Sequence, residues 1–202
     1  WLRDRFIALI DREIAHAKEG KEAYIVAKMN SLCDRQIIEK LYEASSVGVE
    51  IYLVIRGICC LRTGIPGVSE HIHVTSIVGT FLEHSRIFYF YNNGQEDIYM
   101  GSADWMPRNL DRRVEIVFPV EDDVIKDRIK HILDVLLRDN LKAYAMLSDG
   151  TYAKMSRRGK QAIGAQMTFC REAMEGAKEE TTVWKGRRFI PIWAFDEEEH
   201  EA

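Results

Sequence analysis

The stretch Val49-Glu50-Ile51-Tyr52-Leu53-Val54-Ile55 decides the fold of this 202-residue chain. It is almost continuously apolar and rich in β-branched residues, which is typical of a strand buried on both faces of a parallel sheet. A second apolar run, Ala23 to Met29, precedes it. Between the two runs lies a helical pattern that starts at an Asp34 cap and ends at Gly48. The order of strand, helix and strand predicts an α/β fold.

The remaining sequence predicts further elements around this unit. Apolar residues at helical spacing predict an amphipathic helix from Leu2 to Ala17, and the acidic run Asp196 to Glu201 is expected to be solvated and mobile. The other expected elements are strands near 72–78, 87–91, 98–101 and 114–120, a helix over 122–138, a hairpin of 142–146 and 152–155, and a last helix over 159–177.

Charge and hydropathy restrict the class of protein. The net charge is -4, with 28 basic and 32 acidic residues, which argues against a general nucleic-acid-binding surface. No apolar run reaches the roughly 20 residues that cross a bilayer, and the first residues show no signal-peptide pattern. We therefore expect a cytoplasmic protein. The chain opens inside an apparent helix without an initiator Met, so we interpret it as a fragment of a longer polypeptide.

The four cysteines do not form a recognisable metal or redox motif. Cys33, Cys59, Cys60 and Cys170 contain no spaced CxxC pairs, and two adjacent cysteines do not comfortably ligate one zinc ion. We therefore expect buried, reduced thiols rather than metal ligands.

Three segments resemble one half of a phosphoryl-transfer site. In His84-Ser85-Arg86 the two outer side chains point the same way if the segment is extended, so both could face one phosphate. Gly101-Ser102-Ala103-Asp104 offers room and backbone N–H groups for an anion, and Arg108, Arg112 and Arg113 add donors that suit phosphate oxygens. A histidine serves phosphoryl transfer as nucleophile or as proton donor, so His84 is the candidate catalytic residue.

Arg56 is a second candidate because it directly follows the apolar strand. A cation at the carboxyl end of such a strand faces the crevice where open α/β sheets bind ligands, although a surface ion pair is the alternative. The later arginines have alternatives too, since they could form structural salt bridges with Asp104, Asp111 or Glu115. Glu115, on an expected strand, could also hold His84 or an arginine in place.

These segments are similar to known families. The phospholipase D superfamily uses a His-x-Lys motif followed by Gly-Ser-x-Asn/Asp, and here Arg86 replaces the lysine. With residues 54–61, 76–79, 81–86 and 101–113, the chain resembles bacterial polyphosphate kinase of the histidine-phosphorylated type. The segment 28–32 and the spacing from Arg56 to His84 fit as well. The resemblance implies a phospholipase-D-like C-terminal catalytic domain over residues 1–155, with a mixed sheet flanked by helices, and a helical extension with an acidic tail over 156–202.

The resemblance also implies the reaction. Such enzymes reversibly transfer the terminal phosphate of ATP to inorganic polyphosphate through a phosphohistidine, which would lie in a preceding domain together with the Mg²⁺ ligands. This chain alone would be inactive and would contain no metal ligand. His84 and Arg56 would bind ATP, and His84 would be catalytic. Arg86, Arg108, Arg112 and Arg113 would line the polyphosphate path. The full-length enzyme would be a homo-oligomer, and membrane association of that enzyme is left open.

Two alternatives remain. One is a phospholipase-D-type phosphodiesterase, which needs two copies of the histidine motif and would gain the second by dimerisation. The other is a non-catalytic module that binds polyphosphate or a nucleotide.

Overall fold

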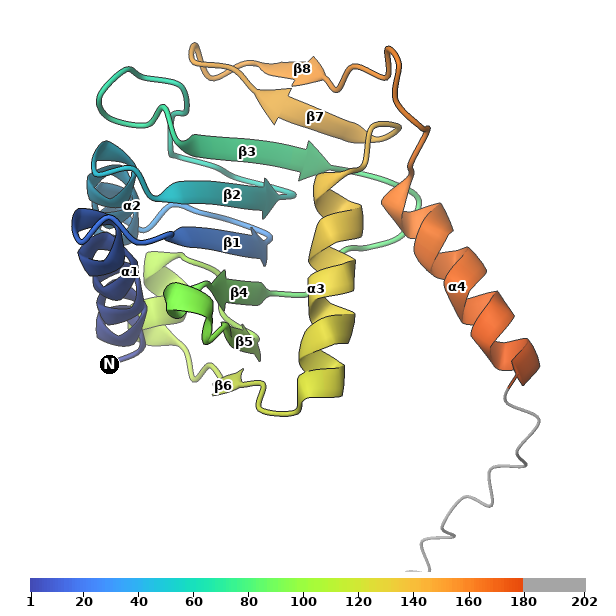
Figure 1. Ribbon diagram of the computed structural model, residues 1–202, viewed down its shortest axis with the longest axis horizontal. Coiled ribbons are helices and arrows are strands. Elements are labelled where there is room, and N and C mark those ends of the chain that lie inside the picture. The colour runs from blue at the N-terminus through green and yellow to red at the C-terminus, as the bar shows by residue number, and fades with distance from the viewer. Residues whose placement is uncertain (180–202) are drawn as a thin grey trace, which may run out of the picture. The chain divides into compact units, whose positions relative to one another are not determined.

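A mixed sheet of eight strands forms the centre of residues 1–168 in this computed structural model (Figure 1). The structure describes residues 1–179, so the acidic run expected to be mobile lies outside the described residues. The strand order is β6-β5-β4-β1-β2-β3-β7-β8. A second unit begins at Phe169, and its described part belongs to helix α4 (Ala165–Glu179).

The stretch around Val49 forms a central strand of this sheet, as expected. β2 (Glu50–Ile55) lies between β1 (Tyr24–Met29) and β3 (Ile72–Ile77), parallel to both. The other strands pair in antiparallel fashion and are β4 (Ile87–Phe90), β5 (Asp97–Gly101), β6 (Val117–Pro119), β7 (Ala143–Met146) and β8 (Tyr152–Lys154). The α/β fold with a mixed sheet is therefore confirmed.

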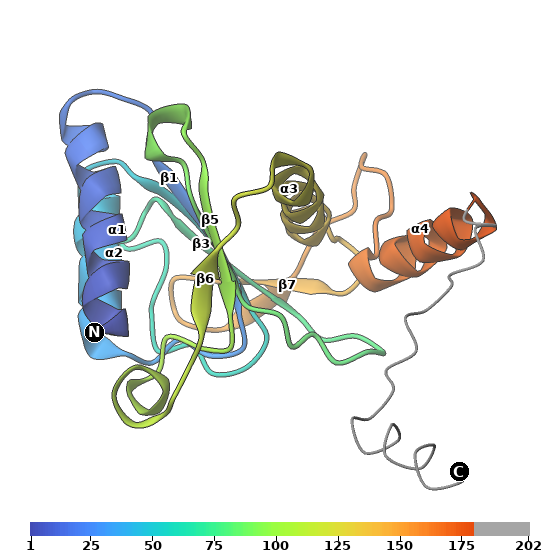
Figure 2. The same ribbon diagram turned by 90° about the horizontal axis from the view of Figure 1, so that it is seen from below.

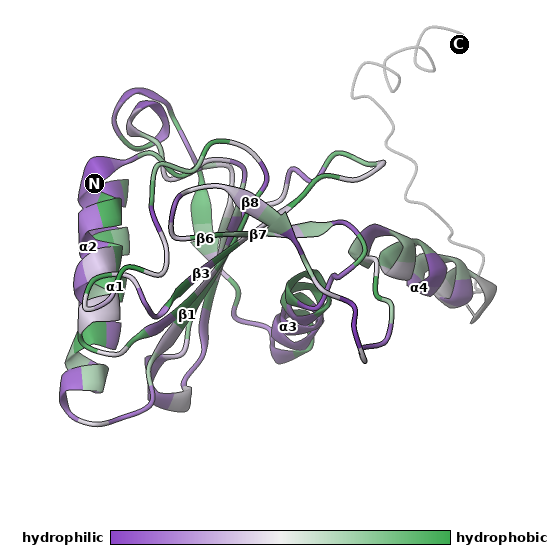
Figure 3. Cartoon of the chain, turned by 90° about the horizontal axis from the view of Figure 1, so that it is seen from above, coloured by the Kyte–Doolittle hydropathy of each residue, from purple (hydrophilic) through white to green (hydrophobic). Residues whose placement is uncertain are grey.

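Helices cover both faces of the sheet. α1 (Leu2–Lys18) and α2 (Arg35–Ser46) lie on one face, and α3 (Asp123–Leu137) lies on the other (Figure 2). Hydrophobic residues of α1 and α2 lie toward the sheet, and hydrophilic ones lie on the outer side (Figure 3). Capping residues fix the starts of α2 and α3. Asp34 accepts a hydrogen bond from Ile37 N (3.1 Å), and Asp122 accepts one from Ile125 N (3.0 Å).

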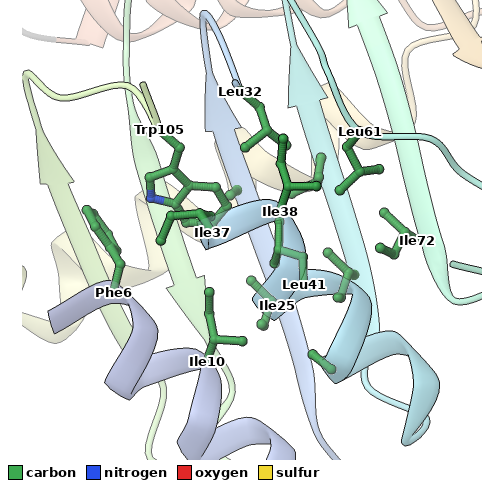
Figure 4. Close-up of a cluster of buried hydrophobic side chains, with 14 of the residues drawn as sticks. Phe6, Ile10, Ile25, Leu32, Ile37, Ile38, Leu41, Leu61, Ile72 and Trp105 are labelled. Atoms are coloured by element: carbon green, nitrogen blue, oxygen red, sulfur yellow. The ribbon is translucent and has the colours of Figure 1, made fainter. Parts of the chain in front are cut away.

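The larger hydrophobic core lies beneath α1 and α2 (Figure 4). Trp105 is fully buried there, with its ring 5.2 Å from that of Phe88 and 5.5 Å from that of Phe6. The carbonyl of Trp105 accepts hydrogen bonds from Cys33 N and Asp34 N, both at 2.9 Å. This residue therefore ties the loop that follows β5 to the start of α2.

Three local expectations differ from the structure. β6 begins at Val117 instead of 114, because Ile116 N donates to the Ser102 hydroxyl and not to a backbone carbonyl of the neighbouring strand. Residues Arg108–Arg112 form a π-helical turn that the sequence pattern did not indicate. α4 begins at Ala165, not near 159. Asn140 is hydrogen-bonded to the Gln161 carbonyl and to Ile163 N ahead of the helix, and Asp139 accepts a hydrogen bond from Ala165 N at its first residue.

The cysteines are free, but the expected burial is wrong. Cys33, Cys59 and Cys170 are half-buried, and Cys60 is exposed. Burial raises the pKa of Cys59 to about 11, which makes that thiol a weak nucleophile. As for membrane spans, no helix between residues 1 and 179 is both long enough and apolar enough to cross a bilayer.

Candidate functional site

Arg56 lies where the parallel strands β1 and β2 end. Its Nε donates to Asn30 Oδ1 (3.1 Å), and Asn30 directly follows β1. The next residue, Gly57, donates from its N–H to the Asn30 carbonyl at 2.8 Å, and a Cβ at this position would lie only 2.9 Å from that oxygen. Neither Nη group of Arg56 is hydrogen-bonded within the described residues, so the planar end of the guanidinium is open to an anion.

His84 lies in the loop between β3 and β4, in residues 78–86, which form neither helix nor strand. Its ring is exposed and makes no hydrogen bond within residues 1–179. The backbone around it is held firmly, since Arg86 Nη1 donates to the His84 carbonyl and Lys28 Nζ donates to the Ser85 carbonyl, each at 2.8 Å. The loop thus presents a free imidazole on a fixed backbone.

Asp104 connects the two candidates. It is 4% exposed and accepts from Asn30 N (2.8 Å), Arg86 Nε (3.2 Å) and Arg86 Nη2 (3.0 Å). One continuous set of hydrogen bonds therefore runs from Arg56 through Asn30, Asp104 and Arg86 to the backbone of His84. Residues from separate segments of the sequence therefore converge at the end of the sheet where β1, β2 and β5 finish.

Lys28 is a buried cation that sequence reasoning noted only as part of a matching segment. Its exposed fraction is 1%, and burial lowers its pKa to about 8, while Glu83, 3.9 Å away, acts in the opposite direction. Arg56 and Arg86 lower the pKa further through charge repulsion. The signal that could have found it is a lone lysine within the otherwise apolar strand β1.

Gly101 and Ser102 do not offer their N–H groups to an anion, so that expectation is wrong. Gly101 N donates to the Arg86 carbonyl (3.4 Å), and Ser102 N donates to the Ile116 carbonyl (2.9 Å). A Cβ on Gly101 would collide with that same Ile116 carbonyl. The glycine makes room for the neighbouring chain segment at the β5–β6 edge.

Glu115 holds neither His84 nor an arginine, which corrects a second expectation. It precedes β6 and accepts hydrogen bonds from Ser102 Oγ and Asn109 Nδ2. Since these partners lie after β5 and in the π-helical turn, the carboxylate fixes the segment between them. Asn109, which lies in the same turn as Arg108, is buried and belongs to this network.

The arginines fall into two groups. Arg86 has every nitrogen bound within the chain, because Nε and Nη2 meet Asp104 and Nη1 meets the His84 carbonyl. Three others are exposed and form no hydrogen bond or ion pair within the described residues, namely Arg108, Arg112 and Arg113. The salt bridges considered for these three are therefore not formed, since Asp104 pairs with Arg86 and Asp111 pairs with Arg3. Contact of these four arginines with polyphosphate stays a prediction.

Metal binding has no support in the described residues. Within residues 1–179, no group of three or more His, Cys, Asp or Glu side chains could hold a metal ion.

The mixed sheet, with the histidine and Gly-Ser segments at one end of its strands, defines a mixed α/β protein. Residues 1–166 match the family model described as polyphosphate kinase C-terminal domain 2. A polyphosphate kinase from Thermosynechococcus vestitus is 58% identical over 151 residues, which cover 75% of this chain and 21% of that protein. The chain therefore belongs to the polyphosphate kinase family.

Solved structures agree with this assignment. The polyphosphate kinase from Porphyromonas gingivalis matches with a TM-score of 0.82 and 42% identity, covering 88% of this chain and 27% of that one. NucT from Helicobacter pylori matches with a TM-score of 0.50 and 13% identity, over 67% of this chain and 88% of that one, which shows a common fold alone. The chain thus spans between a fifth and a third of the length of the polyphosphate kinases it matches.

Proposed function

We propose that this chain is the C-terminal catalytic part of a polyphosphate kinase, which reversibly transfers the terminal phosphate of ATP to inorganic polyphosphate. The observation that supports it best is the hydrogen-bonded connection of Arg56 to the His84 backbone, at the end of the sheet where β1 and β2 finish. A free imidazole and an open guanidinium end suit a substrate that consists of linked phosphates.

Each residue has a distinct role in this proposal. Arg56 binds nucleotide phosphates through its two Nη groups and neutralises their charge. The terminal phosphoryl group moves from ATP to a histidine nitrogen in a preceding part of the polypeptide, and then to the terminal oxygen of polyphosphate. His84 faces that histidine and donates a hydrogen bond or a proton to the leaving oxygen. Preceding domains of the same polypeptide complete the site, and the whole enzyme is a homo-oligomer that uses Mg²⁺ bound outside this chain.

The exposed arginines Arg108, Arg112 and Arg113 supply the positive path for polyphosphate in this proposal. None of them is neutralised by an ion pair within the described residues, so their charge is available to a polyanion. Arg86 contributes to the positive potential of the site, but its contacts with Asp104 make it first of all a support for His84.

The test uses a full-length polypeptide that carries this chain. His84→Ala is expected to remove most ATP–polyphosphate transfer although the partner histidine itself stays intact, because the leaving oxygen of ATP loses its donor. Arg56→Ala is expected to raise KM for ATP. His73→Ala is the matched control, because His73 is an exposed histidine of β3 that stacks on Tyr52. Normal transfer rates in His84→Ala would refute the proposal.

The isolated 202-residue chain distinguishes the alternatives. We expect no ATP synthesis from polyphosphate and ADP by this chain, because half of the catalytic groups lie elsewhere. Hydrolysis of a phosphodiester that is lost in His84→Ala would instead favour a phosphodiesterase. Polyphosphate binding that is unchanged when His84→Ala and Arg56→Ala are combined would favour a binding module and overturn the site assignment.

A further inference from the structure

The His84 loop has a second support that comes from the far end of the chain. Gln166, in the first turn of α4, binds both backbone groups of Phe81: Phe81 N donates to Gln166 Oε1 (3.0 Å), and Gln166 Nε2 donates to the Phe81 carbonyl (2.7 Å). The same Nε2 donates to Glu83 Oε1 at 3.1 Å. One side-chain amide thus fixes two of the three residues that precede His84.

The loop is shaped to receive this amide. A Cβ on Gly79 would collide with Oε1 and Cδ of Gln166, so any other residue here would push the Gln166 amide out of this position. Gly79 does not adopt a positive φ, which removes the usual conformational reason for glycine. Its absence of a side chain is therefore explained by the approach of Gln166.

Gln166 itself starts from a rigid base. Asp139 Oδ2 accepts from Ala165 N (2.7 Å), and Asn140 Oδ1 accepts from Ile163 N (3.0 Å). Both Asp139 and Asn140 are buried, at 1% and 5% exposure, between α3 and β7. The backbone that carries Gln166 is thereby fixed to the sheet-forming part of the chain.

Glu83 is held from two sides next to His84. One carboxylate oxygen accepts from Gln166 Nε2, and the other lies 3.9 Å from Lys28 Nζ. Lys28 also donates to the Ser85 carbonyl on the other side of His84. The histidine therefore lies between backbone anchors that originate in β1 and in α4.

We propose that Gln166 is a positioning residue for His84. Gln166 holds the loop so that the imidazole is presented in one orientation, and the catalytic consequence rests on the function proposed above. Because Arg56 is held by Asn30 and not by this loop, loss of the Gln166 contacts should affect turnover more than nucleotide binding.

A first experiment measures the loop without any reference to activity. In the 202-residue chain, Gln166→Met keeps the side-chain length but removes both hydrogen-bonding groups, and amide hydrogen exchange at Phe81 is followed by NMR. We expect exchange at least tenfold faster than in the original chain. The converse substitution at the next, exposed position, Met167→Gln, should leave it unchanged. Unchanged exchange at Phe81 in Gln166→Met would overturn the structural part of the proposal.

A second experiment measures turnover in a full-length polypeptide that carries this chain. Gln166→Met should lower kcat about tenfold with KM for ATP within twofold, since a small misplacement of a catalytic group is costly. Gly79→Ala displaces Gln166 from the loop side and should likewise lower kcat while KM for ATP stays nearly unchanged. The proposal is therefore testable even if one variant folds poorly. Fast exchange at Phe81 with normal kcat would refute the positioning role, whereas normal rates in His84→Ala would refute the proposed function instead.

Discussion

Asp104→Ala removes the carboxylate that connects Arg56 and His84, and the structure allows its cost to be worked out. Arg86, whose side chain is 11% exposed, would lose its bidentate partner, and Asn30 N would lose its acceptor. Removing one partner of a buried ion pair costs about 3–5 kcal/mol because the other charge stays buried. We expect the free energy of unfolding of the 202-residue chain to fall by that amount.

Urea denaturation of single and double variants tests this reasoning. Arg86→Met removes the stranded charge, so the double variant Asp104→Ala/Arg86→Met should be about 2–3 kcal/mol more stable than the sum of the single effects predicts. Asp111→Ala is the matched control. Its carboxylate is 43% exposed, and its partner Arg3 keeps Asp34, so we expect a loss below about 1 kcal/mol. Additive effects at Asp104 and Arg86 would refute the coupling that we infer between them.

Three further predictions concern the same part of the molecule. Lys28 has a pKa of about 8 in the folded chain, below the value of about 10.4 for an unperturbed lysine. Between these values the unfolded chain binds more protons than the folded chain, so stability rises with pH. From pH 8 to 10.5, the free energy of unfolding should rise by up to about 3 kcal/mol more in the original chain than in Lys28→Met. Urea-denaturation profiles that change equally with pH in the two proteins would contradict this. Trp105→Ala empties a fully buried site against Phe6 and Phe88 and should cost about 3–5 kcal/mol in urea unfolding, where a loss below about 1 kcal/mol would contradict the packing. Gly101→Ala should cost about 1–3 kcal/mol because its Cβ meets the Ile116 carbonyl, and the same change at the open Gly176 should show no such loss of thermal stability.

Much of the fold could be predicted because the signals are local. The β-branched run that ends at Ile55 specifies a buried strand by its own composition, and Asp34 and Asp122 cap helices through hydrogen bonds to residues only three positions later. The expected starts of a strand at 114 and of the last helix at 159 were wrong for the opposite reason, since these elements begin at Val117 and Ala165. Each depends on a side chain from a distant segment, Ser102 in the first case and Asp139 in the second.

The candidate site likewise has features that the local sequence indicates and others that depend on tertiary contacts. The sequence by itself determined the family resemblance and named His84 and Arg56 as candidates, because motif order and spacing are properties of the chain. Only the tertiary structure decided that Arg86 turns to Asp104 and that Glu115 binds Ser102 and Asn109. A charged side chain pairs with whichever partner the sheet order places beside it in a buried environment, where leaving it unpaired is costly. That order brings β1 between β4 and β2, and no local pattern in the sequence encodes it.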